Sequence, residues 1–413
     1  MVPSSTIRTA LKIGGRCSSG NSTSTTGPMT VATRPSTCSA ISFDSLLLQR
    51  LGAGDDLEQF LRDCGLTGPV EQQRQVVDHI ARVAGGRIHR CHAGRLLGGR
   101  RIIERGLDLG LAVLGALAAG EYFGGEVKRL AEELYADVNW KWFTNPVTKH
   151  PYLACYPQQR PSKVPADITK DGMFGAWAAY SEHIFLYVLA AGAPNPDFAT
   201  GADSYYAMKT FKGRYKGEEF IFCGTGAAFT YQWTHAFIDF RNIRDKLGRN
   251  WFENSRHAAL AARQYAIDNA DRIKGLGPNS WGMSACISPS TGYSGHYGSH
   301  PIGAGHKLLE DGTVAPYGAL SFLPFTPKES TAALEHMYQI PGLVGDYGLY
   351  DAYSYATKAK GDQPWIAKSY LGIDKGLVLL MFENYSTQLI WRLLHQNTHV
   401  QNGLKRLEFV HVE

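Results

Sequence analysis

Two glutamates stand at the start of apolar helical segments and have aromatic neighbours. Glu182 lies in AWAAYSEHIFLYVLAAG, beside Trp177, Tyr180 and Phe185. Glu253 lies in WFENSRHAAL, where an aromatic pair precedes an alanine-rich run. Burying an unpaired charge is unfavourable, so an acid at the start of a buried helix indicates a function. Glycoside hydrolysis needs two such carboxyl groups: one protonates the leaving oxygen, and the other attacks the sugar or activates water.

The surroundings of the two glutamates differ. Glu253 would face the positive end of its helix dipole, with Arg256 one turn away, and both favour its ionised form. Apolar rings around Glu182 favour a raised pKa, so we expect Glu182 to be the general acid. The alternative for Glu253 is an ordinary acidic residue in a first helical turn. An inverting enzyme would separate the carboxyl groups by roughly 6.5–9.5 Å and a retaining one by about 5–5.5 Å, which the sequence does not determine.

Further residues have side chains that suit contact with a sugar. Aromatic rings can stack on sugar rings, and amide, imidazole, guanidinium and carboxylate groups can bind hydroxyls. The aromatic candidates are Trp140, Trp142, Trp177, Tyr180, Tyr231, Trp233, Trp281 and Tyr293. The polar candidates are Gln232, His235, Asp239, Arg256, Asp311, Asp351 and Asp374. Each also has a plain packing interpretation, and Asp239 is close enough to Arg241 in the sequence to form a structural ion pair.

Motifs of several other chemistries are missing from the sequence. CGTGAAF lacks the GK[ST] of a phosphate-binding loop, and no GxSxG elbow or HExxH helix occurs. The seven cysteines are scattered and form no CxxC pair, which argues against a zinc cluster or a disulfide framework. A net charge of +5 over 413 residues does not favour nucleic-acid binding. We therefore expect no metal and no organic cofactor.

The elements that must position these residues are mostly helical. Apolar residues at three- and four-residue spacing predict helices within 107–123, 125–143, 180–192, 195–211, 257–270, 326–338 and 375–396, after earlier ones from residue 44. Asn195 and Pro196 suit a helix start, and Thr326 and Glu329 have capping-box spacing. One hairpin strand is expected in 216–224. Buried helices paired with amphipathic ones predict an all-α toroid of inner and outer helices, with long loops such as 271–325 around a cleft.

The beginning of the chain differs from the rest. Residues 1–43 contain no Asp or Glu and are rich in Ser and Thr, which fits a leader-like segment, a disordered tail or a misassigned start. We expect residues 44–413 to form one domain, with 85–106 atypical because this tract is rich in Gly, Arg and His. No run of 18 apolar residues occurs, so no membrane span is expected. We predict a monomer without a clear secretory signal, and the scattered cysteines favour the cytoplasm.

From about residue 107 onward, the chain resembles the glycoamylase-like family. That family includes endo-β-1,2-glucanases and the glycan-processing domain of cyclic β-1,2-glucan synthases. The resemblance covers about three-quarters of the chain and is carried, in the family's order, by DLGLAVLGALAAGEYF, AEELYADVNWKWF, YSEHIFLYVLAAGAPNP, FTYQWTHAFIDFRNIRDKLGRNWFENSRHAALAARQYAIDN, GPNSWGMSAC, DGTVAPYGALSFLPFTP, GLYDAYS and YLGIDKGLVLLMFENYSTQLIWRLL.

The resemblance implies an (α/α)₆ toroid and hydrolysis or transfer of a β-linked glucan, most simply a β-1,2-glucan. It places the carboxylates of the family's Ser-Glu and Glu-Asn-Ser-Arg motifs at Glu182 and Glu253. The tract 85–106 departs from the family, because the aromatic and acidic residues expected before Asp108 are absent. One hypothesis is a reading-frame slip or a splicing error in this tract. Two alternatives stay open: a glycan-binding toroid without turnover, and a transglycosylase on the same substrate class.

Overall fold

The computed structural model of the protein describes residues 106–155, 169, 172–303 and 308–412. The expectations for 1–43, for the helices from residue 44 and for residues 85–105 of the atypical tract lie outside the described residues. Within them the longer helices are α5 (Gly106–Phe123), α6 (Gly125–Ala136), α7 (Ile184–Gly192), α9 (Trp251–Asp268), α11 (Pro327–Tyr338), α12 (Gly372–Ser386), α13 (Leu389–Gln396) and α14 (Thr398–Arg406). Two short helices, α8 (Ala202–Tyr206) and α10 (Pro316–Leu320), complete the α-helices of this part.

Short 3₁₀ turns and small sheets connect the helices. The 3₁₀ turns are η1 (Ala228–Tyr231), η2 (Trp233–Ala236) and η3 (His300–Ile302). The strands are β1 (Ala154–Cys155), β2 (Met173–Phe174), β3 (Phe211–Tyr215), β4 (Glu218–Phe222), β5 (Ile243–Arg244), β6 (Cys286–Ser288), β7 (Gly292–Ser294), β8 (Thr313–Val314), β9 (Val344–Gly345), β10 (Gly348–Leu349), β11 (Ala352–Ser354), β12 (Trp365–Ala367) and β13 (Val410–His411). All pair antiparallel, and the largest sheet has the order β12-β11-β8.

The helix-rich part of the predicted fold is confirmed, but the all-α description is too strict. Helices α5, α6, α7, α9 and α11 lie where the apolar periodicity predicts them. The expected hairpin strand is β4, which pairs with β3 from Phe211↔Phe222 to Tyr215↔Glu218. The strands other than β3 and β4 are two or three residues long. Strands this short cannot show an alternating pattern in the sequence.

Three details of the predicted helices are wrong. Asn195 does not begin a long helix: its side chain accepts from the Asp197 N–H in a turn, and α8 begins only at Ala202. Thr326 precedes α11 but makes no side-chain cap, because its hydroxyl bonds back to the Phe322 carbonyl. The expected helix 375–396 is broken between α12 and α13 by Gln388, whose φ of 59° is left-handed.

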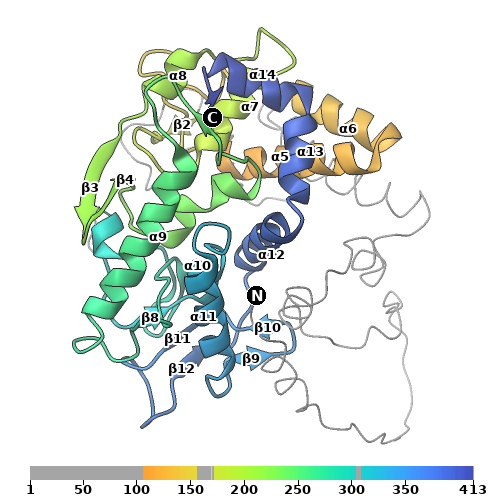
Figure 1. Cartoon of the computed structure of the whole chain (residues 1–413). Coiled ribbons are helices and arrows are strands. Elements are labelled where there is room, and N and C mark those ends of the chain that lie inside the picture. Colours follow the sequence, from red (N-terminus) through yellow and green to blue (C-terminus); the bar gives the residue numbers. More distant parts are fainter. Residues whose placement is uncertain (1–105, 156–168, 170–171, 304–307, 413) are drawn as a thin grey trace, which may run out of the picture.

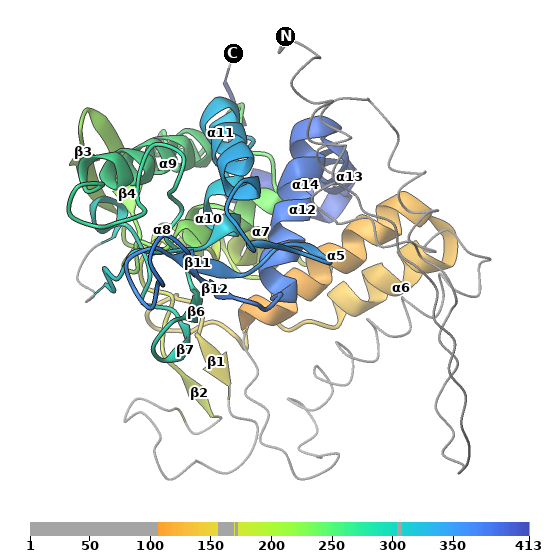
Figure 2. The same ribbon diagram turned by 90° about the horizontal axis from the view of Figure 1, so that it is seen from below.

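The helices lie in two groups joined by α12 (Figure 1). Helices α5, α6, α7, α13 and α14 pack together, and α10 and α11 lie with β8–β12 on the other side. Figure 2 shows α12, α13 and α14 beside α5 and α6, with α9 and α11 farther across the molecule. One hydrophobic core runs through both groups, with large buried side chains such as Trp251, Trp281 and Phe185. Helix α12 thus connects the two groups.

Helices α7 and α14 cross at two glycines. A Cβ on Gly192 would collide with the His399 carbonyl oxygen, and one on Gly403 would collide with the Val188 carbonyl oxygen. The backbones can therefore approach this closely only because neither position carries a side chain. The crossing holds α7, and the segment leading into it, against the C-terminal helices.

Helix α5 is long and apolar enough to cross a membrane, by length and composition alone. It is the one such helix among the described residues, and 44% of its apolar window is buried. It packs against α6, α7 and α13. A helix in the core of a folded domain has this same composition.

Candidate functional site

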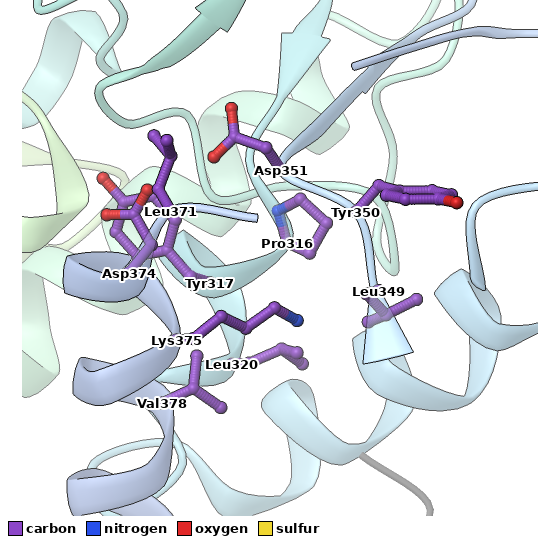
Figure 3. Close-up of a pocket in the computed structure, with 10 residues that line it drawn as sticks. All are labelled: Pro316, Tyr317, Leu320, Leu349, Tyr350, Asp351, Leu371, Asp374, Lys375 and Val378. Atoms are coloured by element: carbon purple, nitrogen blue, oxygen red, sulfur yellow. The ribbon is translucent and has the colours of Figure 1, made fainter. Parts of the chain in front are cut away.

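A recess between α10, β10 and the start of α12 contains two buried aspartates. Figure 3 shows the carboxyl groups of Asp351 and Asp374 beside Pro316 and Tyr317 of α10. The other lining residues are Leu320, Leu349, Tyr350, Leu371, Lys375 and Val378. The space in and around the recess amounts to about 310 Å³, which includes open solvent, so the recess itself is a shallow depression.

Asp374 lies in the first turn of α12, and Asp351 lies between β10 and β11. Each residue is less than a tenth exposed. Burial and, to a smaller extent, the negative charge of Asp351 together raise the pKa of Asp374 to about 8. Burial also raises the pKa of Asp351, against the opposing effect of the Ile287 N–H that donates to its Oδ2 at 2.7 Å. Two interacting carboxyls of this kind retain on the order of one proton at neutral pH.

Neighbouring groups fix and tune this aspartate pair. The Lys375 ammonium lowers the pKa of both carboxyls. Burial raises the pKa of the nearby Cys286 thiol. The Tyr317 hydroxyl donates to the Ala285 carbonyl and lies within hydrogen-bond distance of Ser284 Oγ, each at 2.8 Å. Among the described residues, the buried oxygens Oδ1 of Asp351 and Oδ2 of Asp374 have no hydrogen-bond partner.

Glu182 is buried as the sequence predicts. It is 6% exposed and lies two residues before α7 begins. Burial raises the pKa of its carboxyl, although the Ser181 hydroxyl donates to it and acts in the opposite direction. The Thr234 hydroxyl donates to the Glu182 carbonyl at 2.7 Å, and the turn η2 that carries Thr234 packs on α12. Glu182 is thus connected through η2 to the helix that carries Asp374, although Glu182 itself does not line the recess.

Glu253 has a different environment. It lies in the first turn of α9, where Asn250 caps the helix by accepting its N–H at 2.9 Å. Its side chain is 48% exposed and forms an ion pair with Arg256 at 3.4 Å. In the part of the chain that the structure describes, no hydrogen bond or ion pair joins Glu253 to Glu182. The helix-start position is thus as expected, while the side chain points to the surface.

Most of the other predicted contact residues lie in the core. Trp140, Tyr180, Tyr231, Trp233, His235 and Trp281 are buried, and so is Gln232. Tyr180 stacks on Trp251 at 4.8 Å between ring centroids, and Trp281 stacks on Phe322 at 6.0 Å. His235 Nε2 lies 3.0 Å from Ser255 Oγ. These side chains pack in the core, and their contact with a sugar stays a prediction.

The remaining candidates are spread over the surface. Trp142 and Trp177 are half-buried, and Trp177 stacks on His183. Asp239 forms the ion pair with Arg241 that the sequence suggests, at 2.6 Å. Asp311 accepts from the Tyr297 hydroxyl at 2.7 Å, and Tyr293 is exposed. Of all the candidates, the recess brings together only Asp351 and Asp374.

Comparison with known proteins identifies the family. A family model described as "Glycoamylase: Putative glucoamylase" matches residues 175–398, which is more than half of the chain. The chain belongs to this family. The matched residues include Glu182, Glu253, Asp351 and Asp374.

Relatives of this glycoamylase-like chain include enzymes named for β-1,2-linked glucans. An exo β-1,2-glucooligosaccharide sophorohydrolase of Parabacteroides distasonis is 26% identical over 330 residues, which cover 72% of this chain and 42% of the relative. The chain thus matches less than half the length of that relative. The endo-β-1,2-glucanase of Chitinophaga pinensis, solved with sophorotriose and glucose, is 24% identical, with a TM-score of 0.66 and coverage of 89% and 86%. A β-1,2-glucanase of Parabacteroides distasonis is 23% identical, with a TM-score of 0.61 and coverage of 74% and 45%. These two structures show a shared fold.

Several residues of the recess were not among the sequence candidates. Tyr317, Tyr350 and Lys375 line it beside the aspartate pair. Two of them lie in short motifs of the sequence: Tyr350 precedes Asp351 in GLYDAYS, and Lys375 follows Asp374 in YLGIDKG. Each motif joins an aromatic residue to an aspartate within a few positions. A tyrosine next to an acid in a short loop is a pattern that sequence reasoning could have ranked above the buried tryptophans.

The described residues contain no group of three or more His, Cys, Asp or Glu arranged to hold a metal ion. The aspartate pair has only Lys375 as a charged neighbour in the recess, and a cation there would disfavour a second bound cation.

Proposed function

We propose that the protein is a glycoside hydrolase that cleaves a β-linked glucan, with β-1,2-glucan as the substrate. The observation that carries this proposal is the solvent-open recess with two interacting, buried carboxyls, one of which has a pKa of about 8. Perturbed carboxyls in a concave site are what acid–base chemistry at neutral pH requires. The names of the relatives supply the substrate class.

The proposed mechanism uses two carboxyl functions. Glu182, buried and with a raised pKa, donates the proton to the leaving glycosidic oxygen. The Asp351–Asp374 pair supplies the carboxylate that activates water or attacks the sugar, because a pair that shares one proton keeps one carboxyl ionised near neutral pH. This assignment keeps the predicted acid and replaces Glu253, since the Glu253 side chain is half-exposed and paired with Arg256.

We also propose the finer architecture that the resemblance implies, an (α/α)₆ toroid in one domain over residues 44–413. The α5–α6 hairpin and the packing of α7 on α14 support paired helices. The monomeric state and the cytoplasmic location stay predictions.

Chain-length analysis of linear β-1,2-glucan tests the proposed function. Wild-type protein should release short saccharides, with β-1,3-glucan, β-1,4-glucan and starch as substrate controls. Glu182→Gln and Asp374→Asn should each abolish release, and Asp351→Asn should reduce it strongly. Glu253→Gln should retain activity, and its inactivity would restore the pair Glu182 and Glu253. Binding without products would favour the non-catalytic glycan-binding alternative, and products longer than the substrate would favour a transglycosylase.

A further inference from the structure

Three tyrosines form a cluster beside the recess, on the two segments that carry its aspartates. Tyr347 lies four residues before Asp351, and Tyr370 lies four residues before Asp374. Tyr350, next to Asp351, lines the recess itself. Ring centroids of Tyr347 and Tyr370 are 5.4 Å apart in an edge-on arrangement, and those of Tyr350 and Tyr370 are 5.0 Å apart. The three rings thus form one continuous cluster that begins inside the recess and ends outside it.

The cluster is held in place by backbone. Strands β9 and β10 pair as Gly348↔Gly345 and Leu349↔Val344, so Tyr347 occupies a two-residue hairpin loop. The Tyr347 N–H donates to the Tyr370 hydroxyl at 3.2 Å. A Cβ on Gly345 would collide with the hydroxyl groups of both Tyr370 and Tyr350, so only glycine lets these rings pack against the hairpin. The backbone therefore holds the three rings in place, with Tyr347 exposed and Tyr350 and Tyr370 half-buried.

Exposure separates this cluster from the core aromatics. Tyr347 is 67% exposed, whereas Trp281, Tyr231 and Trp251 are fully buried. Lys375 lies over the Tyr370 ring at 5.7 Å and also lines the recess, so polar groups border the rings. A pyranose ring offers an apolar C–H face and a rim of hydroxyls, which matches a flat ring bordered by hydroxyl and ammonium donors. The recess is too small to hold several sugar rings, so a glucan chain that reaches it must extend outside it.

We propose that Tyr347, Tyr350 and Tyr370 form a tyrosine platform on which the glucan chain stacks as it leaves the recess. The platform rests on the proposed function, and it makes Tyr347 a residue that sets the preference for longer chains. Tyr350 guides the sugar at the mouth, Tyr370 orients the other two rings, and Tyr347 contacts the outermost sugar. The occupant is a β-linked glucan of at least several residues.

The test compares chain lengths with the Tyr347→Ala and Tyr347→Phe variants. With a long linear β-1,2-glucan, Tyr347→Ala should raise KM about two- to tenfold while kcat stays within about twofold. With the shortest saccharide that is cleaved, KM should not change, because that substrate does not reach Tyr347. Tyr347→Phe should keep the wild-type KM, since stacking needs the ring. Tyr385→Ala, an exposed tyrosine farther along α12, is the matched control and should behave as wild type.

Other outcomes separate the platform from the proposed function. An unchanged KM for long chains in Tyr347→Ala, or an equal change for short and long chains, would overturn the platform while hydrolysis stands. If the wild type releases no products, titration calorimetry with the same long glucan replaces the kinetic assay. Binding that is weaker in Tyr347→Ala than in Tyr385→Ala then supports the platform although the hydrolase proposal fails. Equal binding, or none, overturns it.

Discussion

The Gln232 side-chain amide donates a hydrogen bond of 2.8 Å to the backbone carbonyl of Gly318. Gln232 joins the turns η1 and η2, and Gly318 lies in the middle of α10, which forms one wall of the recess. The bond therefore ties the layer that contacts Glu182 through Thr234 to the wall beside the aspartate pair. Gln232, which the sequence suggested as a sugar contact, thus connects two parts of the site.

Replacing Gln232 should destabilise the fold. Gln232→Ala leaves the buried Gly318 carbonyl without its donor and should reduce the free energy of unfolding by about 1–3 kcal/mol. Urea denaturation measures the change. Gln264→Ala, which removes an exposed bond to Asp268, is the control and should leave the midpoint nearly unchanged. Equal midpoints for both variants would show that the α10 contact contributes little.

The aspartate pair should make stability depend on pH. The folded-state pKa of Asp374 is about 8, above its unfolded value near 4, so the folded protein binds the extra proton between these pH values. The free energy of unfolding should therefore fall as pH rises from about 4 to about 8, by at most ~1.4 kcal/mol per pH unit for this group. Asp374→Asn should flatten the decline, measured by urea unfolding at several pH values. An identical pH profile in wild type and variant would refute the raised pKa.

The buried ion pair just before α9 should contribute more to the free energy of unfolding than a surface pair does. Asp245 accepts from the Tyr205 hydroxyl and from Arg249, and its side chain is fully buried. Arg249→Met leaves this carboxylate without its counter-charge and should lower the free energy of unfolding by about 3–5 kcal/mol. Arg214→Met breaks the exposed pair with Glu219 and should barely move the thermal midpoint. Similar midpoints for the two variants would contradict this ranking.

The α7–α14 crossing should not tolerate a methyl group. Gly403→Ala forces a Cβ against the Val188 carbonyl and should destabilise the protein by about 3 kcal/mol, through strain that the backbone can relieve only by moving apart. Gly115→Ala in α5 is the matched helical control, because nothing lies near its added Cβ. It should stabilise by up to ~1 kcal/mol through helix propensity. Thermal unfolding of both variants, followed by circular dichroism, decides the matter.

The sequence predicts those parts of the fold that depend on local pattern. Helices α5 and α9 follow from apolar spacing over four or five turns, and Glu253 does lie in a first helical turn. The break at Gln388 was missed because a left-handed residue other than glycine carries no sequence signal. Strands of two residues, such as β9 and β10, were missed because their pairing depends on the surrounding structure.

The candidate site was predicted by residue type but not by grouping. The sequence marks Asp351 and Asp374 as candidates and Glu182 as a buried acid, and their burial agrees with this. The sequence could not show that Trp281 and Tyr231 are buried in the core while Tyr347 is exposed, because an aromatic residue suits both environments. Nor could it show that two aspartates 23 positions apart (374 − 351) would face one recess.

The two-residue loop between β9 and β10 has a consequence for binding thermodynamics. A ring carried by a tight hairpin and braced by Tyr370 has few conformations to lose when a ligand arrives. The entropy lost on association then falls mainly on the flexible glucan rather than on the protein. Loosening the hairpin, for example by lengthening its loop with glycines, would weaken affinity without removing a single contact and would appear in calorimetry as a less favourable binding entropy.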